Sequence, residues 1–277
     1  MIRAFILMTG LGLLAACHST ESRQCAYHDD PIPEHVILTI QSEILDEPRT
    51  IPVYTPPGYE ESDDAYPVLY MPDGGICEDF PHIVNRVDAL VSAGELAPVI
   101  VVGIENTFRR RDLTPDSQDE SEAQIAPIDD GATAFRAFIR GELMPQINST
   151  YRTSGQTAII GESAAGLFIV DTLFRDSQLF DRYIAMDPSI YWDNHELVRL
   201  TPERLPVLSG LGLTFWFTAA GTEDIYPHTD ALAEILEQSA PDDMSWTYDP
   251  RPDEDHYTIY RATEEDALRW ALWLATP

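Results

Sequence analysis

Short apolar runs alternate with amphipathic stretches along most of this chain. Apolar runs rich in β-branched and aromatic residues cover residues 66–71, 97–104, 157–161, 182–186 and 213–221. Such runs are typical of parallel strands that are buried on both faces. Helical spacing of apolar residues is found at residues 78–95, 132–151, 164–176 and 229–238. This alternation predicts an α/β fold with a mostly parallel, doubly wound sheet.

The two ends of the pattern add further elements. Residues 35–45 and 49–56 alternate in polarity and predict an antiparallel pair of strands at the start. A last strand is expected in the segment SWTYDP, residues 245–250, and a closing helix follows it. Thr263 and Asp266 have a spacing similar to a capping box, so we expect this helix to open at Thr263.

Ser163 stands where one buried strand gives way to a helix. The strand TAIIG ends at Gly161, and the segment Glu162-Ser163-Ala164-Ala165 follows directly. Small neighbours are needed at such a sharp turn because larger side chains would clash. The strand–turn–helix context indicates a nucleophile elbow, although Ala165 occupies the second glycine position of G-x-S-x-G. The sequence therefore predicts Ser163 as a catalytic nucleophile.

A serine nucleophile needs a histidine base, and three histidines follow Ser163. In α/β-hydrolases the chain order is serine, acid, histidine. His195 comes too early for that order, and His228 is placed at the start of a predicted helix. His256 lies between the last predicted strand and the closing helix, where the base is expected. His256 is therefore the predicted base.

The acid and the oxyanion donors are expected in neighbouring loops. The loop after the strand at 213–221 offers Glu223 and Asp224, while Asp187 follows the strand at 182–186. The loop after the strand at 213–221 is the usual place of the acid, so either Glu223 or Asp224 is expected to orient the imidazole, and Asp187 is an outside candidate. For the oxyanion hole we expect the backbone N–H of Ala164 and that of Gly75, in the Gly-Gly turn after the strand at 66–71.

The motifs together resemble those of an esterase family of α/β-hydrolases. The relevant segments are YPVLYMPDGG, RRRDLTP, residues 132–153, GESAAGLFIVDTLFRDSQLFDRYIAMDPSIYWDN and DEDHYTIYRATEEDALRWA. The family includes enterochelin and salmochelin esterases, and its wider relatives include feruloyl and acetyl-xylan esterases. The resemblance covers roughly residues 35–275, and it implies an α/β-hydrolase fold.

The resemblance also implies roles for single residues. The family nucleophile falls on Ser163 and the base on His256, and Glu is common at the position of Glu223, which is therefore the preferred acid. The chain departs from the family pattern at Ala165, at Asp187, where serine is usual, at Tyr191, where tryptophan is usual, and at Tyr257, where glycine is usual. Some siderophore esterases of the family are thought to work with a Ser-His dyad, which leaves the role of Glu223 open.

Substrate contacts are expected at two places. Arg109, Arg110 and Arg111 are consecutive cations in the long connection 105–131, and Arg111 in particular is expected to attract an anionic substrate such as a catecholate siderophore. The same arginines could instead neutralise nearby carboxylates. Tyr191 and Trp192 are expected to form a wall for an aromatic acyl group.

The charge of the chain excludes several partners. The formal net charge is −30, and all 17 cationic residues are arginines. Nucleic acid is excluded as a partner because phosphate binding requires a basic surface. No ligand spacing typical of a metal site is present, and serine ester hydrolysis requires no cofactor. We expect a small-molecule ester as the substrate.

The N-terminus has the layout of an export signal. Arg3, a short apolar stretch and the segment LAAC ending at Cys17 resemble a bacterial lipoprotein signal. This predicts a signal peptide at 1–16, a tether at 17–33 and an α/β-hydrolase domain at 34–277. Lipid on Cys17 would anchor the protein to a bacterial cell membrane, facing the periplasm or the exterior. Cys25 and Cys77 could pair in an oxidising compartment or remain thiols.

The sequence as a whole predicts a carboxylic ester hydrolase that acts through an acyl-enzyme on Ser163. A siderophore-esterase-like activity is favoured, and a feruloyl or acetyl esterase of carbohydrate side chains is the alternative. A non-catalytic, lipid-anchored binding protein is the third reading, because a fold alone does not fix a function.

Overall fold

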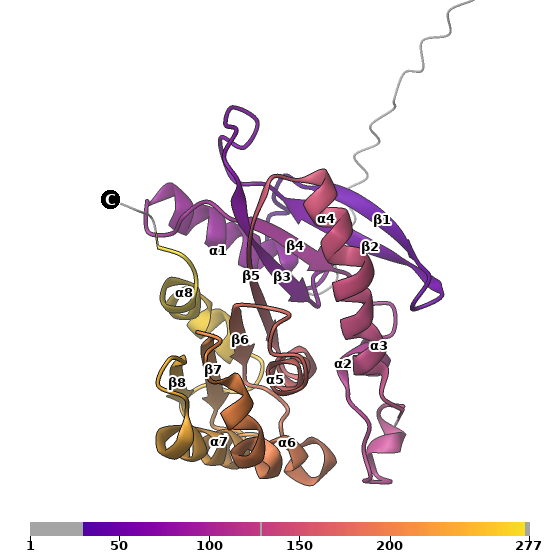
Figure 1. Cartoon of the computed structure of the whole chain (residues 1–277), viewed down its shortest axis with the longest axis vertical. Coiled ribbons are helices and arrows are strands. Elements are labelled where there is room, and N and C mark those ends of the chain that lie inside the picture. The colour runs from indigo at the N-terminus through magenta and orange to yellow at the C-terminus, as the bar shows by residue number, and fades with distance from the viewer. Residues whose placement is uncertain (1–29, 128, 275–277) are drawn as a thin grey trace, which may run out of the picture.

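The computed structural model describes residues 30–127 and 129–274, and its strands form one sheet (Figure 1). The strands are β1 (Val36–Ser42), β2 (Glu47–Tyr54), β3 (Tyr66–Pro72), β4 (Ile100–Ile104), β5 (Thr153–Glu162), β6 (Arg182–Met186), β7 (Thr214–Ala220) and β8 (Ser245–Arg251). Their order in the sheet is β1-β2-β4-β3-β5-β6-β7-β8. The pairs β1–β2 and β2–β4 are antiparallel, and all other neighbouring strands are parallel. The predicted α/β sheet with an N-terminal antiparallel pair is confirmed.

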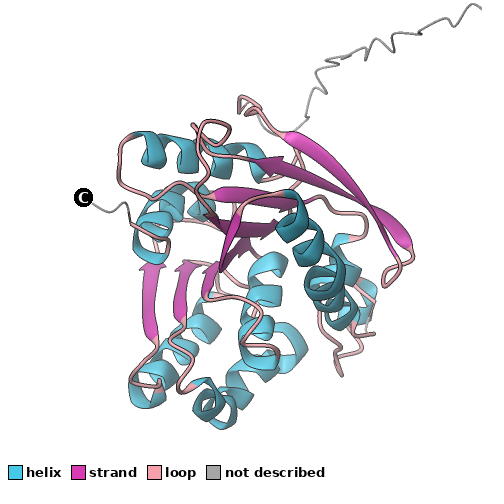
Figure 2. Cartoon of the chain, turned by 45° about the horizontal axis from the view of Figure 1, so that its top comes forward, coloured by secondary structure: helices cyan, strands magenta, loops and turns pink. Residues whose placement is uncertain are grey.

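Helices cover both faces of this sheet (Figure 2). They are α1 (Phe80–Ser92), α2 (Arg109–Leu113), α3 (Gly131–Phe138), α4 (Met144–Thr150), α5 (Ala164–Arg175), α6 (Trp192–Arg204), α7 (Tyr226–Ser239) and α8 (Ile259–Ala271). Short 3₁₀ turns are found at Glu122–Gln124 and Leu205–Leu208. Buried side chains of α1 and α8 pack on one face of the sheet, and those of α3, α5, α6 and α7 pack on the other.

Alternation along the central strand β5 divides its side chains between the two layers. Ile159 belongs to the core under α3 and α5, whereas Ile160 belongs to the core under α1 and α8. Because successive strand residues point to opposite faces, Glu162 lies on the same face as Ile160. The parallel strands end at a common edge of the sheet, and the loops that follow them carry the predicted catalytic residues.

The helix expected over 132–151 is interrupted. Residues Ile139–Leu143 form a π-helical turn between α3 and α4. Pro145, in the first turn of α4, has no backbone N–H to donate to the preceding turn, so the regular hydrogen-bond ladder cannot continue through it. The apolar pattern predicts the helix but not this local change of pitch.

The closing helix begins one turn earlier than expected. Helix α8 starts at Ile259, and Thr263 lies inside it with its hydroxyl donating to the backbone carbonyl of Ile259. The capping-box interpretation of Thr263 and Asp266 is therefore wrong. Because of this earlier start, the first turn of α8 follows closely after His256 in the chain.

Candidate active site

Ser163 occupies a strained turn between β5 and α5. Its backbone has φ 60° and ψ −116°, a conformation that L-residues rarely adopt. The turn is tightly packed: a Cβ atom on Gly161 would lie 2.6 Å from Cβ of Ala165, and one on Gly166 would lie 2.9 Å from Cα of Pro188. These contacts explain the small residues around the serine, and they place its hydroxyl at the carboxyl edge of the sheet.

The Ser163 hydroxyl is hydrogen-bonded to a histidine that is in turn bonded to a carboxylate. His256 Nε2 lies 3.0 Å from Ser163 Oγ, and His256 Nδ1 lies 2.6 Å from Oδ2 of Asp187. Asp187 is buried, and its other oxygen accepts from the N–H of Ala220, 2.9 Å away. The hydrogen bond that His256 donates to Asp187 raises the pKa of His256, while burial opposes this shift. The three residues have the arrangement of a Ser-His-Asp triad.

This geometry contradicts the prediction that Glu223 is the acid of the triad. Glu223 is exposed in the loop between β7 and α7, and the Nδ1 atom that it was expected to bind is already bonded to Asp187. Asp187 directly follows β6, the neighbour of β5, and the hydroxyl of Thr218 and the N–H of Ala220 on β7 hold it in place. The sequence signal for Asp187 was its position directly after the strand at 182–186.

The two predicted oxyanion donors differ in whether their backbone N–H groups are already hydrogen-bonded. Ala164 is the first residue of α5, so its N–H has no acceptor within the helix. The N–H of Gly75, in contrast, donates to Oε2 of Glu78 over 2.7 Å. Gly75 is therefore not available as a free donor in this structure, because the carboxylate of Glu78 has folded back over it. No pattern in the sequence predicts this contact between Gly75 and Glu78.

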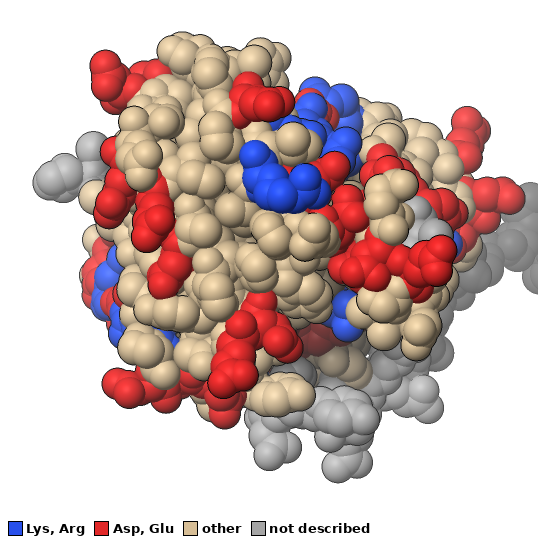
Figure 3. All heavy atoms as spheres, turned by 90° about the horizontal axis from the view of Figure 1, so that it is seen from below, with Lys and Arg blue, Asp and Glu red and all other residues tan. Residues whose placement is uncertain are grey.

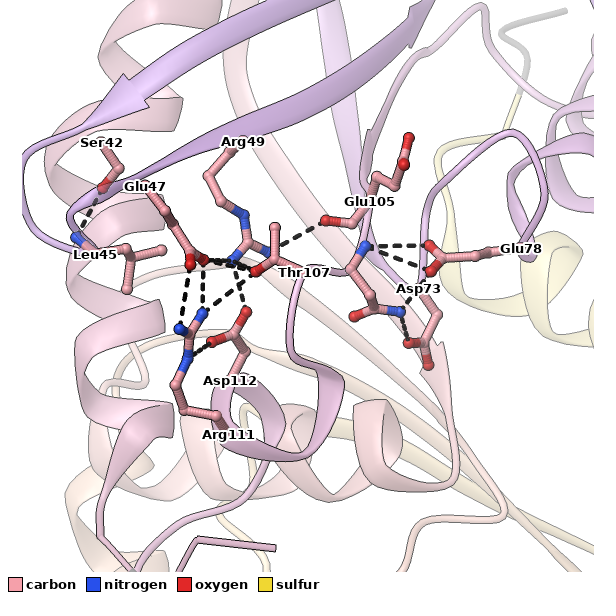
Figure 4. A network of polar contacts seen from close by, with 11 residues as sticks. Ser42, Leu45, Glu47, Arg49, Asp73, Glu78, Glu105, Thr107, Arg111 and Asp112 are labelled. Carbon is pink, nitrogen blue, oxygen red and sulfur yellow. Dashed lines mark hydrogen bonds and ion pairs between the residues drawn. The ribbon is translucent and has the colours of Figure 1, made fainter. Parts of the chain in front are cut away.

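The arginines of α2 serve different purposes, and Figure 4 shows Arg111 among its partners. Arg111 bonds to Glu47 on β2 and to Asp112, and its hydrogen bond is the main reason that the pKa of Glu47 is lowered to about 2. Buried Arg49 completes this cluster with a 2.6 Å contact to Asp112. Arg111 therefore joins β2 to α2, and its prediction as a substrate-binding residue is wrong.

Arg109 is the arginine of this group that reaches the nucleophile turn. Its Nε and Nη2 atoms contact the two carboxylate oxygens of Asp73, each at 2.7 Å. Nη2 also lies 3.5 Å from the backbone oxygen of Glu162, the residue before Ser163. The charge of Arg109 is thus matched by Asp73, so it is not a free cation for a substrate.

Trp192 holds a loop in place and does not line an open pocket. Its side chain is buried, and Nε1 donates to the carbonyl of Pro115 over 3.0 Å. The adjacent Asp193 accepts from the N–H of Gln118 and donates its own N–H to Glu122. These bonds fasten the 115–122 segment to the start of α6, so the aromatic-wall prediction fails for Trp192. Tyr191 is half-buried and remains a candidate wall.

A groove lies between the loops that follow β7 and β8. It has a volume of about 400 Å³ and is lined by Gly221, Thr222, Glu223, Tyr226, Pro227 and Pro252. The two loops touch closely, since Gly221 donates its N–H to the carbonyl of Glu254. The second loop carries His256 and the strongly exposed ring of Tyr257. Glu223 therefore lines the groove between these two loops and does not orient the base.

The chain is similar to known esterases. A family model described as "Putative esterase" matches residues 42–258. The chain belongs to this esterase family. Both the fold and the family predicted from the sequence are confirmed.

The curated proteins that this chain resembles include siderophore esterases. The chain is 29% identical over 154 residues to ferri-bacillibactin esterase BesA of Bacillus subtilis, a match that covers 50% of this chain and 52% of BesA. It is 36% identical over 67 residues to a siderophore enterobactin esterase of Emericella nidulans, covering 24% of this chain and 20% of that protein. The matched segments thus span about half, or less, of these curated relatives.

Solved structures of the esterase family superpose well on this fold. An IroE-like serine hydrolase from Shewanella oneidensis has a TM-score of 0.77 at 29% identity, covering 86% of this chain and 79% of that structure. The BES protein from Bacillus cereus has a TM-score of 0.76 at 22% identity, covering 89% and 98%, and shows the shared fold.

Three further predictions concern metals, membranes and cysteines. Within residues 30–127 and 129–274, no group of three or more His, Cys, Asp or Glu side chains is arranged to hold a metal ion, and no helix is long and apolar enough to cross a membrane. Cys77 is disulfide-bonded. Cys25, its predicted partner, and Cys17, the predicted lipid site, lie outside the described residues.

Proposed function

We propose that this protein is a serine ester hydrolase that works through an acyl-enzyme. The observation that carries the proposal is the continuous hydrogen-bonded chain from Ser163 Oγ through His256 to Asp187. His256 accepts the hydroxyl proton as Ser163 Oγ attacks the ester carbonyl, forming a tetrahedral intermediate. The imidazolium then protonates the leaving alkoxide. Water, deprotonated by the same imidazole, releases the acid and restores the serine.

Each partner of the nucleophile has a defined task in this reaction. Buried Asp187 fixes the Nδ1–H tautomer of His256 and stabilises the imidazolium that forms during attack. The N–H of Ala164, at the start of α5, donates to the developing oxyanion, which the positive end of that helix also favours. Gly75 can act as the second donor only when the Glu78 carboxylate leaves its N–H.

We propose siderophore esters as the substrates. This rests on the names of the relatives, a ferri-bacillibactin esterase and a siderophore enterobactin esterase, and on the likeness to an IroE-like hydrolase. The groove between the loops after β7 and β8, the second of which carries His256, offers apolar surface on Tyr226, Pro227 and Pro252 for an aromatic part of such an ester.

A substrate panel tests both levels of this proposal. The purified protein is assayed with short 4-nitrophenyl esters, with ferric and iron-free catecholate lactones, and with feruloylated sugars. We expect hydrolysis of the aryl esters and a clear preference for the lactones. Preference for feruloylated sugars would overturn the substrate assignment, and no turnover of any ester would overturn the enzymatic function.

Two variants test the catalytic assignment. Ser163→Ala and His256→Ala are each expected to abolish acyl-enzyme formation. Because the pair acts as a unit, the double variant should be little worse than either single one. Turnover close to that of the unaltered protein in either single variant would contradict the proposed roles.

We also propose that the protein is exported and held at a bacterial membrane through lipid on Cys17, with residues 1–16 as the signal, 17–33 as the tether and 34–277 as the hydrolase domain. The support is the LAAC segment, and the very acidic domain offers no attraction to an anionic membrane. Cys17→Ser should retain full esterase activity and leave the membrane fraction at both low and high salt. Persistent sedimentation with membranes would contradict the anchor.

A further inference from the structure

Glu162, the residue before the nucleophile, carries a carboxyl group that the reaction above does not use. It ends β5 and lies on the sheet face covered by α1 and α8. Its Oε1 atom is buried and accepts no hydrogen bond from any residue that the structure describes. The side chain as a whole is half-buried, but a buried carboxylate oxygen without a donor is costly, so this atom needs a physical explanation.

The charges that act most strongly on Glu162 lie in the surrounding loops, and most are acidic. They belong to Asp73 and Asp79 of the β3–α1 connection, Asp187 of the loop after β6, and His256 of the loop after β8. Arg109 of α2 touches only its backbone oxygen and is already paired with Asp73.

The first turn of α8 adds no donor either. Tyr260 is buried, its hydroxyl has no hydrogen-bond partner among the described residues, and the charge of Glu162 is among those that raise its pKa. Glu264, on the next turn, is bonded to His82 and Arg86. An ionised Glu162 would therefore be surrounded by carboxylates without a cation of its own.

We infer that Glu162 is a positioning residue, held as a neutral carboxylic acid beside Ser163 and His256, and that release of its proton to solvent at alkaline pH strengthens His256 as the base. Burial, followed by repulsion from Asp79, raises the pKa of Glu162 to about 8, in agreement with this geometry. While Glu162 is neutral, Asp187 is the carboxylate that balances the imidazolium. Once Glu162 is ionised, a second negative charge stabilises the same imidazolium.

The inference rests on the proposed ester hydrolysis, and a pH profile tests it. We would measure kcat/KM for 4-nitrophenyl acetate from about pH 6 to about pH 10, subtracting the spontaneous rate measured with Ser163→Ala. In the unaltered protein we expect one rise from His256 and a further rise of roughly three- to tenfold centred near pH 8. Glu162→Gln should be active and keep only the first rise.

Glu264→Gln is the matched control, because Glu264 is buried on the same face of the sheet but is bonded to His82 and Arg86. Its profile should keep both rises. Identical profiles for Glu162→Gln and the unaltered protein would overturn the inference, and so would an activity loss in Glu162→Gln that is uniform across pH, because that would indicate a structural role only.

A second readout needs no substrate and separates this inference from the proposed function. Since the pKa of Glu162 is raised on folding, its stabilising contribution is present below the ordinary carboxyl range and is lost as pH rises through about 8. The Tm of the unaltered protein should therefore fall relative to that of Glu162→Gln between about pH 5 and about pH 9. A constant Tm difference would show that Glu162 is ionised throughout. If Glu162→Gln does not fold, infrared difference spectra of the unaltered protein must show a protonated carboxyl band that disappears near pH 8.

Discussion

His256 and Asp187 are the residues whose roles depend most on their immediate contacts. The 2.6 Å hydrogen bond between them raises the pKa of His256 above 6.5, and the base must be neutral to accept the serine proton. Esterase activity should therefore fall as the pH is lowered through a value above the ordinary histidine pKa. A pH profile of kcat/KM checks this, and an acid limb centred below pH 6.5 would contradict the paired state of the histidine.

Replacing the acid tests which carboxylate acts. Asp187→Asn removes the charge that stabilises the imidazolium, so kcat should fall by about 10²- to 10⁴-fold and the acid limb should move to lower pH. The matched control is Glu223→Gln, which should retain kcat within about twofold because Glu223 is exposed and not bonded to His256. A large loss of kcat in Glu223→Gln with almost none in Asp187→Asn would instead show that Glu223 is the acid.

Single residues were predictable from the sequence to the extent that local chain geometry defines them. Ser163 is marked by its strand–turn–helix context, and His256 by its place after the last strand. Asp187 was only an outside candidate, because the choice between loops depends on which strand neighbours β5 and on hydrogen bonds from β7. Arg111 and Trp192 were misassigned because their partners, Glu47 and Pro115, are distant in the sequence.

At the level of elements, the β5–α5 turn is the most constrained part of the fold. A methyl group added by Gly161→Ala would meet the Cβ of Ala165 at 2.6 Å, so we expect a loss of about 1–3 kcal/mol in the free energy of unfolding. Adding Ala165→Gly removes the clashing atom and should recover part of that loss. Denaturant unfolding of the four proteins of this double-mutant cycle measures the coupling. Strict additivity would mean that the two positions do not pack together.

Most elements were predictable because the apolar runs have clear periods. The strands at 66–72, 182–186 and 214–220 lie within one or two residues of the expected limits. The failures are local. The π-helical turn before α4 occurs because Pro145 has no backbone N–H to donate. The early start of α8 depends on tertiary packing, which the spacing of Thr263 and Asp266 does not predict.

At the scale of the whole molecule, charge is the dominant feature. The net charge is −30, and acidic side chains are spread widely over the face shown in Figure 3, whereas basic ones gather in a few small groups. Repulsion among these carboxylates opposes folding and is screened by salt. Raising NaCl from about 0.02 M to about 0.5 M should therefore increase the Tm, by about 2–4 °C for each kcal/mol gained. Calorimetry at fixed pH measures this, and a Tm that falls with salt would show that attractive ion pairs outweigh the repulsion.

The most direct test of the central claim is to trap the covalent intermediate. The protein is treated with a fluorophosphonate, which reacts with activated serines, and the modified peptide is located by mass spectrometry. We predict one adduct per chain, on Ser163, in the unaltered protein and in Glu223→Gln, and strongly reduced labelling in His256→Ala and Asp187→Asn. A stoichiometric adduct on another residue, or unchanged ester turnover after complete labelling of Ser163, would contradict the account.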